Sequence, residues 1–106
     1  MPITRRLKLS LSLVALMVYA MVAGCAGAPI QEMSDARQAI RAAERAGAAK
    51  YAPEPLAEAK KLVEQARAQM QQRQYRDARY AAEEARTKAV QARRISEDQG
   101  APPPRP

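Results

Sequence analysis

"YAPEPL", residues 51–56, is the stretch that decides how this 106-residue chain folds. Pro53 and Pro55 lack a backbone N–H and have a fixed φ, so they do not fit inside a helix, but both suit its opening turn. One helix must therefore end before this stretch, and another begins within it. The alanine-rich part of the chain is divided here into separate helical units.

Two helices are predicted after this stretch, one ending near Gln72 and one spanning Tyr75 to Ile95. Ala, Glu, Gln, Arg and Lys dominate both segments, and these are strong helix formers. Apolar residues recur at steps of three and four, which places them on one face of each helix. The first stripe is Leu56, Ala59, Val63, Ala66 and Met70, and the second is Tyr75, Ala78, Ala82, Ala85, Ala89 and Ala92.

The junction between these two segments leaves two alternatives open, one continuous helix or a helical hairpin. The apolar stripe steps from Met70 to Tyr75, a jump of five residues. At 100° per residue, that step turns the apolar face by about 140° in a straight helix. A turn at residues 72–75 would let both stripes face each other, so the pattern favours the hairpin.

A third helix is predicted before the stretch, from Ser34 to Ala49, with Ser34 as its N-cap. Its apolar positions are Ala36, Ala39, Ile40, Ala43 and Ala46. The predicted fold is all-α: an alanine-rich helical hairpin or three-helix bundle, similar to a coiled coil or a tetratricopeptide unit. Alanine removes little apolar area from water, so the core is thin. Self-association and a monomeric bundle both remain open.

Charged residues on the first helix form a basic row. Arg37, Arg41 and Arg45 are spaced at i,i+4, so they lie on one side and repel one another. The row is either an ordinary solvated face or a contact surface for peptidoglycan or anionic lipid. Two stabilising i,i+4 pairs are also expected: Lys60 with Glu64, and Glu84 with Lys88.

The N-terminus has the three parts of a secretory signal. Basic residues at positions 5, 6 and 8 precede an apolar stretch from Leu9 to Ala23, and small residues follow it. About fifteen strongly apolar residues are few for a bilayer span, which needs roughly twenty. The alternative is an uncleaved membrane anchor with a buried, inert Cys25, because the charge-free run continues to Ile30.

Val22-Ala23-Gly24-Cys25 resembles the bacterial lipobox. The resemblance implies cleavage after Gly24, a diacylglycerol on the Cys25 thiol and an acyl chain on its new amino group. Several chains anchor firmly, since each buried methylene contributes about 0.8 kcal/mol. By the same resemblance, an aspartate directly after the lipidated cysteine would retain a Gram-negative lipoprotein at the inner membrane. This chain has Ala26 there, which indicates transfer to the outer membrane, with the protein facing the periplasm. Anchoring at the inner membrane is the alternative.

Composition limits the chemistry that this chain can perform. It has no histidine and a single cysteine. An internal disulfide, a Cys/His metal site and a histidine general base are therefore excluded. The net charge of +7 would suit nucleic acid, but export and the lack of aromatic residues interleaved with the basic ones, which would stack on bases, argue against it. We expect no enzyme activity, no cofactor beyond the lipid on Cys25, and no small-molecule substrate.

These features predict four segments. Residues 1–24 are a lipoprotein signal peptide, residues 25–33 a linker that starts at the lipidated Cys25, and residues 34–95 the helical domain. Residues 96–106, with a glycine and four prolines, are predicted to be disordered or polyproline-like.

Tyr51-Ala52-Pro53-Glu54-x-Leu56-x-x-Ala59, followed by Tyr75-x-x-Ala78-x-x-x-Ala82-x-x-Ala85, resembles the DUF4398 family, a domain of unknown function in Gram-negative lipoproteins and envelope proteins. The resemblance covers about residues 28–95 and implies an envelope location without an assigned catalytic activity. The expected function is that of an outer-membrane lipoprotein with a periplasmic helical module. The module would bind an envelope protein or a second copy, or give structural support. The alternative is binding to the cell wall or anionic lipid through the basic row.

Overall fold

The computed structural model describes residues 2–24 and 27–100, with side chains for residues 3–20 and 27–100. Every regular element in these ranges is a helix. The elements are α1 (Pro2–Gly24), α2 (Ile30–Arg45), α3 (Ala48–Tyr51), α4 (Pro53–Gln71) and α5 (Tyr75–Gly100). The predicted all-α fold is confirmed.

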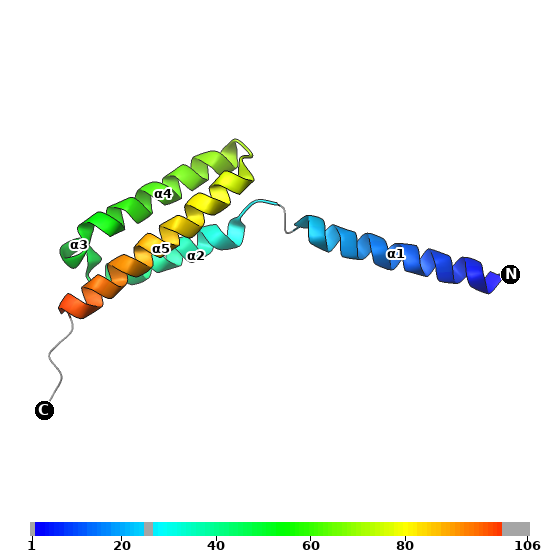
Figure 1. Ribbon diagram of the computed structural model, residues 1–106, viewed down its shortest axis with the longest axis horizontal. Coiled ribbons are helices and arrows are strands. Elements are labelled where there is room, and N and C mark those ends of the chain that lie inside the picture. The colour runs from blue at the N-terminus through cyan, green and yellow to red at the C-terminus, as the bar shows by residue number, and fades with distance from the viewer. Residues whose placement is uncertain (1, 25–26, 101–106) are drawn as a thin grey trace, which may run out of the picture.

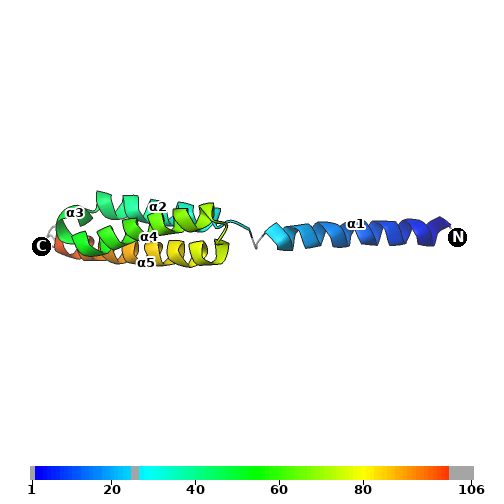
Figure 2. The same cartoon turned by 90° about the horizontal axis from the view of Figure 1, so that it is seen from above.

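Helices α2, α4 and α5 form a three-helix bundle, with the short α3 closing one end (Figure 1). α5 packs against both α4 and α2, whereas α1 packs against none of the other described helices. Figure 2 shows α1 extending away from the bundle on the side where α2 begins. The segment before YAPEPL and the two after it therefore pack together as one unit.

The core of the bundle is built around an alanine face on α5. Larger side chains from α2 and α4 fill the space beside it, including Met33, Ile40, Leu56 and Val63. Met70 is partly buried against this core, and Tyr75 is half-buried. The buried residues of α5 are Ala78, Ala81, Ala82, Ala85, Ala89, Ala92 and Ser96. Alanine lets the three backbones approach closely, so larger residues are needed only on the flanking helices.

Helix α2 begins four residues earlier than expected, at Ile30. The prediction that Ser34 caps this helix is wrong, because Ser34 lies inside it, one turn after its start. Pro29 occupies the N-cap position, and the backbone N–H of Met33 donates to the Pro29 carbonyl at 3.0 Å. A proline fits just before the first turn of a helix, and no residue between Pro29 and Ser34 interrupts the helix, so α2 begins directly after Pro29.

Helix α5 continues to Gly100, five residues beyond the predicted end at Ile95. The expectation that the tail is irregular from Ser96 onward is therefore wrong for residues 96–100. Ser96 is buried, and its hydroxyl donates to the Ala92 carbonyl at 2.7 Å, so it continues the small-residue face. The prolines that would stop a helix start only at Pro102. The rest of the predicted tail, residues 101–106, lies outside the described residues.

A tight turn at residues 72–74 separates α4 from α5 and confirms the hairpin. Arg73 is left-handed, with φ of 60°, and its N–H donates to the Met70 carbonyl at 3.0 Å. The N–H of Gln74 donates to the Gln69 carbonyl at 2.8 Å. This is the Schellman arrangement that ends many helices, and glycine is its usual left-handed residue.

Gly47→Ala is expected to destabilise the bundle by about 1–2 kcal/mol, because a left-handed conformation costs a residue with a Cβ about that much. Gly47 links α2 to α3 with φ of 93°, and an added Cβ would lie 3.2 Å from the Tyr51 ring. Arg73→Gly should have the opposite sign, a gain of about 0.5–1 kcal/mol, because it removes a Cβ from the same conformation. Urea unfolding followed by circular dichroism measures both changes in the free energy of unfolding. A stabilised Gly47→Ala variant would contradict the left-handed conformation of Gly47.

Candidate functional site

The segment that follows Cys25 is bound directly to the bundle. Nη2 of Arg79, on α5, donates to the Gly27 carbonyl at 2.9 Å. Nε of Arg79 also lies 3.6 Å from the Glu32 carboxylate on the first turn of α2. Pro29, which lies between Gly27 and Glu32 in the chain, has a fully buried side chain. The predicted linker is therefore part of the bundle from Gly27 onward, not a free tether.

The lipobox lies at the boundary of the described structure. Cys25 and Ala26 fall outside the described residues, and Val22, Ala23 and Gly24 have a described backbone only, in the last turn of α1. Cleavage, lipidation and sorting at these positions stay predictions. Among the described residues, no helix meets the length and hydropathy needed for a membrane span.

The basic row does not form one continuous surface. Arg37 and Arg41 line an open groove between α2 and α4, joined by Arg67 from α4, whereas Arg45 lies beside Arg93 in a different hollow. A rotation of 40° per four residues carries the row around α2, so its last member leaves the α4 side. The groove has a volume of about 580 Å³ and is lined by Ile30, Met33, Ser34, Arg37, Arg41, Arg67, Met70 and Gln71.

The groove combines positive charge with an apolar floor. Within the described residues, Arg37 and Arg41 make no ion pair, and no carboxylate lines the groove. Arg67 has one distant partner, Glu64, at 3.9 Å, and both side chains are mostly exposed. The side chains of Met33 and Met70 supply the apolar floor, and we call this feature the arginine groove. Chemically, it suits a ligand that has an anionic group and an apolar part.

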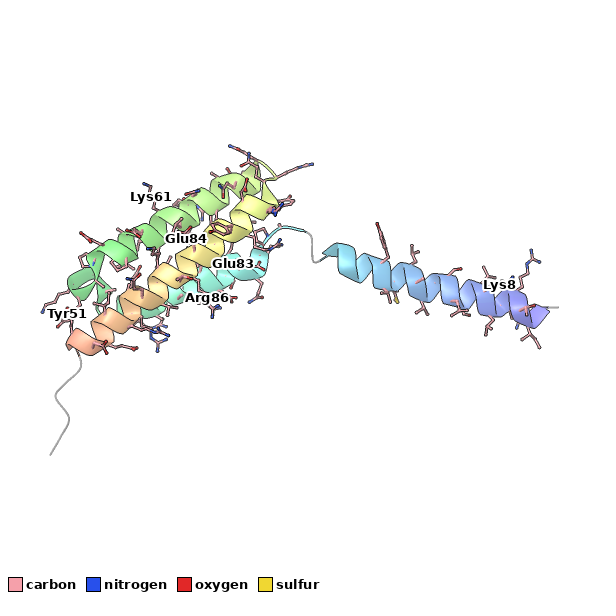
Figure 3. The ribbon with its side chains drawn as sticks, in the orientation of Figure 1. Lys8, Tyr51, Lys61, Glu83, Glu84 and Arg86 are labelled. Atoms are coloured by element: carbon pink, nitrogen blue, oxygen red, sulfur yellow. The ribbon has the colours of Figure 1, made fainter. Side chains whose placement is uncertain are left out.

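The opposite end of the bundle is closed by Tyr51, the tyrosine of the YAPEPL stretch (Figure 3). Its ring lies beside both Gly47 and Gly100, and a Cβ added to Gly100 would lie 3.0 Å from Cε2 of the ring. The ammonium group of Lys50 is 5.1 Å from the ring centroid. Tyr51 therefore holds the α2–α3 corner against the end of α5, which is a structural role.

Exposed charges elsewhere mark the outer surfaces of the bundle. Figure 3 shows Lys61 on α4, and Glu83 and Arg86 on α5, projecting from the helices. Glu83 and Arg86 border a shallow hollow along α5 of about 640 Å³. Its apolar part is formed by the half-buried Val90 and Ile95. This hollow has charges of both signs, unlike the arginine groove.

Sequence reasoning missed Arg79, Pro29 and Arg67. Arg79 bonds to a residue 52 positions away, and helical periodicity relates only residues within a few turns. Arg67 joins Arg37 and Arg41 only because α4 runs back beside α2. The available signal was the lack of an acidic residue three or four positions from Arg37, which left that charge without a partner along its own helix.

Comparison with known proteins places this fold in a family. No curated protein and no solved structure matches the chain. Residues 31–100 match a family described as a domain of unknown function, DUF4398. The match covers well over half of the chain and runs from the first turn of α2 to the last residue of α5. The resemblance noted around YAPEPL is thereby confirmed, and the chain belongs to the DUF4398 family.

Proposed function

We propose that this protein is an outer-membrane lipoprotein, anchored through Cys25, whose helical bundle is a non-catalytic module in the periplasm. The module binds an envelope protein or a second copy of itself, or supports the envelope structurally. The observation that carries the proposal is the direct attachment of the bundle to residues 27–29. A bundle that begins two residues after a lipidated cysteine is held at the membrane surface.

The contacts that hold residues 27–29 against the bundle are strong enough to fix the position of the bundle relative to Cys25. A hydrogen bond from a charged donor contributes about 1.5–3 kcal/mol, and the Arg79 side chain is only 31% exposed. Burial of Pro29 adds apolar contact at the same point. These contacts would give the anchor a defined place at the end of the bundle where α2 begins.

Two surface properties favour binding over catalysis. The carboxylates nearest the YAPEPL stretch, Glu54 and Glu58, are exposed, and Glu58 pairs with Lys88 of α5 at 3.2 Å. The hollow along α5 offers an apolar strip between charges of both signs, which suits a helix of a partner protein or of a second copy. Tyr80, one turn before this hollow, is 72% exposed.

Metabolic labelling with radioactive palmitate in a Gram-negative host tests the anchor. The full chain is expected to carry label that resists neutral hydroxylamine, which cleaves thioesters, because its acyl chains are held by an amide and by glycerol esters. It is also expected to fractionate with the outer membrane. Cys25→Ser should lose the label. The matched control is Cys25→Ser combined with Ala57→Cys, which restores a thiol at an exposed position outside the lipobox pattern and should also stay unlabelled.

Two results of the labelling would contradict the proposal. Labelling of the Cys25→Ser chain would show that the lipid is attached elsewhere. Fractionation of the labelled chain with the inner membrane would overturn the sorting by Ala26, and Ala26→Asp would then leave the distribution unchanged.

The partner is identified by crosslinking from a photoreactive phenylalanine placed at Tyr80 in the labelled chain. The same group at the packed Tyr51 is the control.

A further inference from the structure

We infer that the arginine groove binds the phosphate headgroup of an anionic phospholipid in the membrane that holds the anchor. The guanidinium groups of Arg37, Arg41 and Arg67 would contact the phosphate, and Met33 and Met70 would contact the start of an acyl chain. The inference rests on the proposed anchoring at Cys25, because the anchor supplies the membrane. It adds a second, non-covalent lipid contact formed by the folded bundle.

Charge complementarity is the first argument for this occupant. Three guanidinium groups from two helices share one groove, and no carboxylate lines it. Like charges at i,i+4 destabilise a helix by a few tenths of a kcal/mol, so Arg37 and Arg41 gain from a shared anion. Arginine also binds phosphate through two parallel hydrogen bonds, which makes it suited to a phosphodiester.

The apolar part of the groove is the second argument. Ile30 is 71% exposed at its mouth, and the methionines form the floor. A small inorganic anion would leave this surface in contact with water, whereas a phospholipid covers it with glycerol and acyl carbons. Methionine adapts its shape to flexible chains. The groove volume of about 580 Å³ lies within the range of small-molecule sites.

The position of the groove is the third argument. Ile30 and Met33 are in the first turn of α2, and Met70 and Gln71 are at the end of α4, so part of the groove lies at the end of the bundle where α2 begins. Figure 1 shows the start of α2 and the end of α4 at this same end. Gly27 is bound to Arg79, and Cα atoms are about 3.8 Å apart along the chain, so Cys25 lies within about 8 Å of Gly27. A lipidated Cys25 therefore keeps the groove mouth next to phospholipid headgroups.

The test is a titration of the purified full chain in dodecyl maltoside micelles, followed by backbone amide NMR shifts. The probe is dihexanoyl phosphatidylglycerol, and the reporters are Ser34 and Gln71, which line the groove and are not altered. We expect saturable shifts with this probe. Dihexanoyl phosphatidylcholine, which is zwitterionic, and inorganic phosphate, which has no acyl chain, should each bind at least about tenfold more weakly, since each lost class of contact is worth 1.4 kcal/mol or more.

A pair of charge-matched variants separates a site from general electrostatic attraction. The groove variant combines Arg37→Gln, Arg41→Gln and Arg67→Gln, and the control combines Arg45→Gln, Lys61→Gln and Arg76→Gln. Both remove three positive charges from exposed positions. The groove variant should lose at least about tenfold in affinity, whereas the control should stay within about twofold, because phosphate contacts are local. A third variant with lysine at the three groove positions verifies folding and should retain part of the binding.

Four results would overturn the inference. Equal losses in the two variants would indicate diffuse attraction, and equal binding of phosphatidylcholine would indicate an apolar site. Equal binding of phosphate would indicate an anion site without lipid, and shifts confined to α5 would place the ligand elsewhere. The titration does not require a lipid on Cys25. If the probe does not bind but palmitate labelling is normal, only the phospholipid site in the arginine groove is rejected. Normal binding without labelling would reject the anchor alone.

Discussion

Ala85→Leu is expected to lower the free energy of unfolding of the bundle by about 3 kcal/mol or more, which is at the upper end for overpacking. Ala85 is fully buried on the face of α5 that packs against both α2 and α4. Three added carbon atoms cannot enter this seam unless two helices move apart. A domain of this size has a total stability of only about 4–10 kcal/mol, so the variant should keep only about 1–7 kcal/mol of it.

The measurement is thermal unfolding by circular dichroism of a chain that starts at Ala26, since α1 packs against none of the other described helices. A loss of 3 kcal/mol corresponds to a fall in Tm of about 12–24 °C for a domain of this size. Ala68→Leu makes the same change at an exposed position of α4 and should shift Tm by only a few degrees. Equal effects of the two variants would contradict the close packing of α5.

Leu56→Ala is expected to cost about 2–4 kcal/mol, because it removes buried carbons and leaves a cavity. Leu56 is 5% exposed in the first turns of α4 and is one of the few large aliphatic side chains in the core. Most residues of the core are alanines, which have no flexible side chain that could fill the space. The loss should therefore approach the upper part of this range.

Urea unfolding of the same chain measures the effect as a shift in midpoint at constant slope. Leu62→Ala is the control, since Leu62 has the same side chain but is only partly buried against the core. We expect it to cost about half as much or less, in proportion to the area buried. A larger loss for Leu62→Ala than for Leu56→Ala would mean that the face of α4 that packs inward differs from the one described.

Periodicity was sufficient to predict the helices and most of the buried face. The steps of three and four predicted burial of Leu56, Ala59, Val63 and Ala66 on α4 and of five alanines on α5, and all of them are buried. The five-residue step from Met70 to Tyr75 favoured the turn that the structure contains. These features depend on neighbours along the chain, which is the information that a sequence pattern holds.

Contacts between helices were beyond the reach of the same reasoning. The expected i,i+4 pairs are not the ones formed: Lys60 pairs with Glu44 of α2 at 3.1 Å, and Lys88 pairs with Glu58 of α4 at 3.2 Å. A long lysine side chain reaches a carboxylate on the adjacent helix as easily as one on its own helix, and only the packing decides between them. The arginine groove and the Arg79 contact depend on the same information.

If Cys25 is the membrane anchor, as we propose, the Arg79 contact with Gly27 also limits how far the protein can reach from the membrane. A lipoprotein on a long flexible linker can search the depth of the periplasm, but a bundle attached two residues from Cys25 has no such slack. The length of the bundle is set by its longest helix, α5, whose 26 residues at about 1.5 Å per residue span about 39 Å. With Cys25 as the anchor, any partner must come within roughly 40 Å of the membrane to be bound.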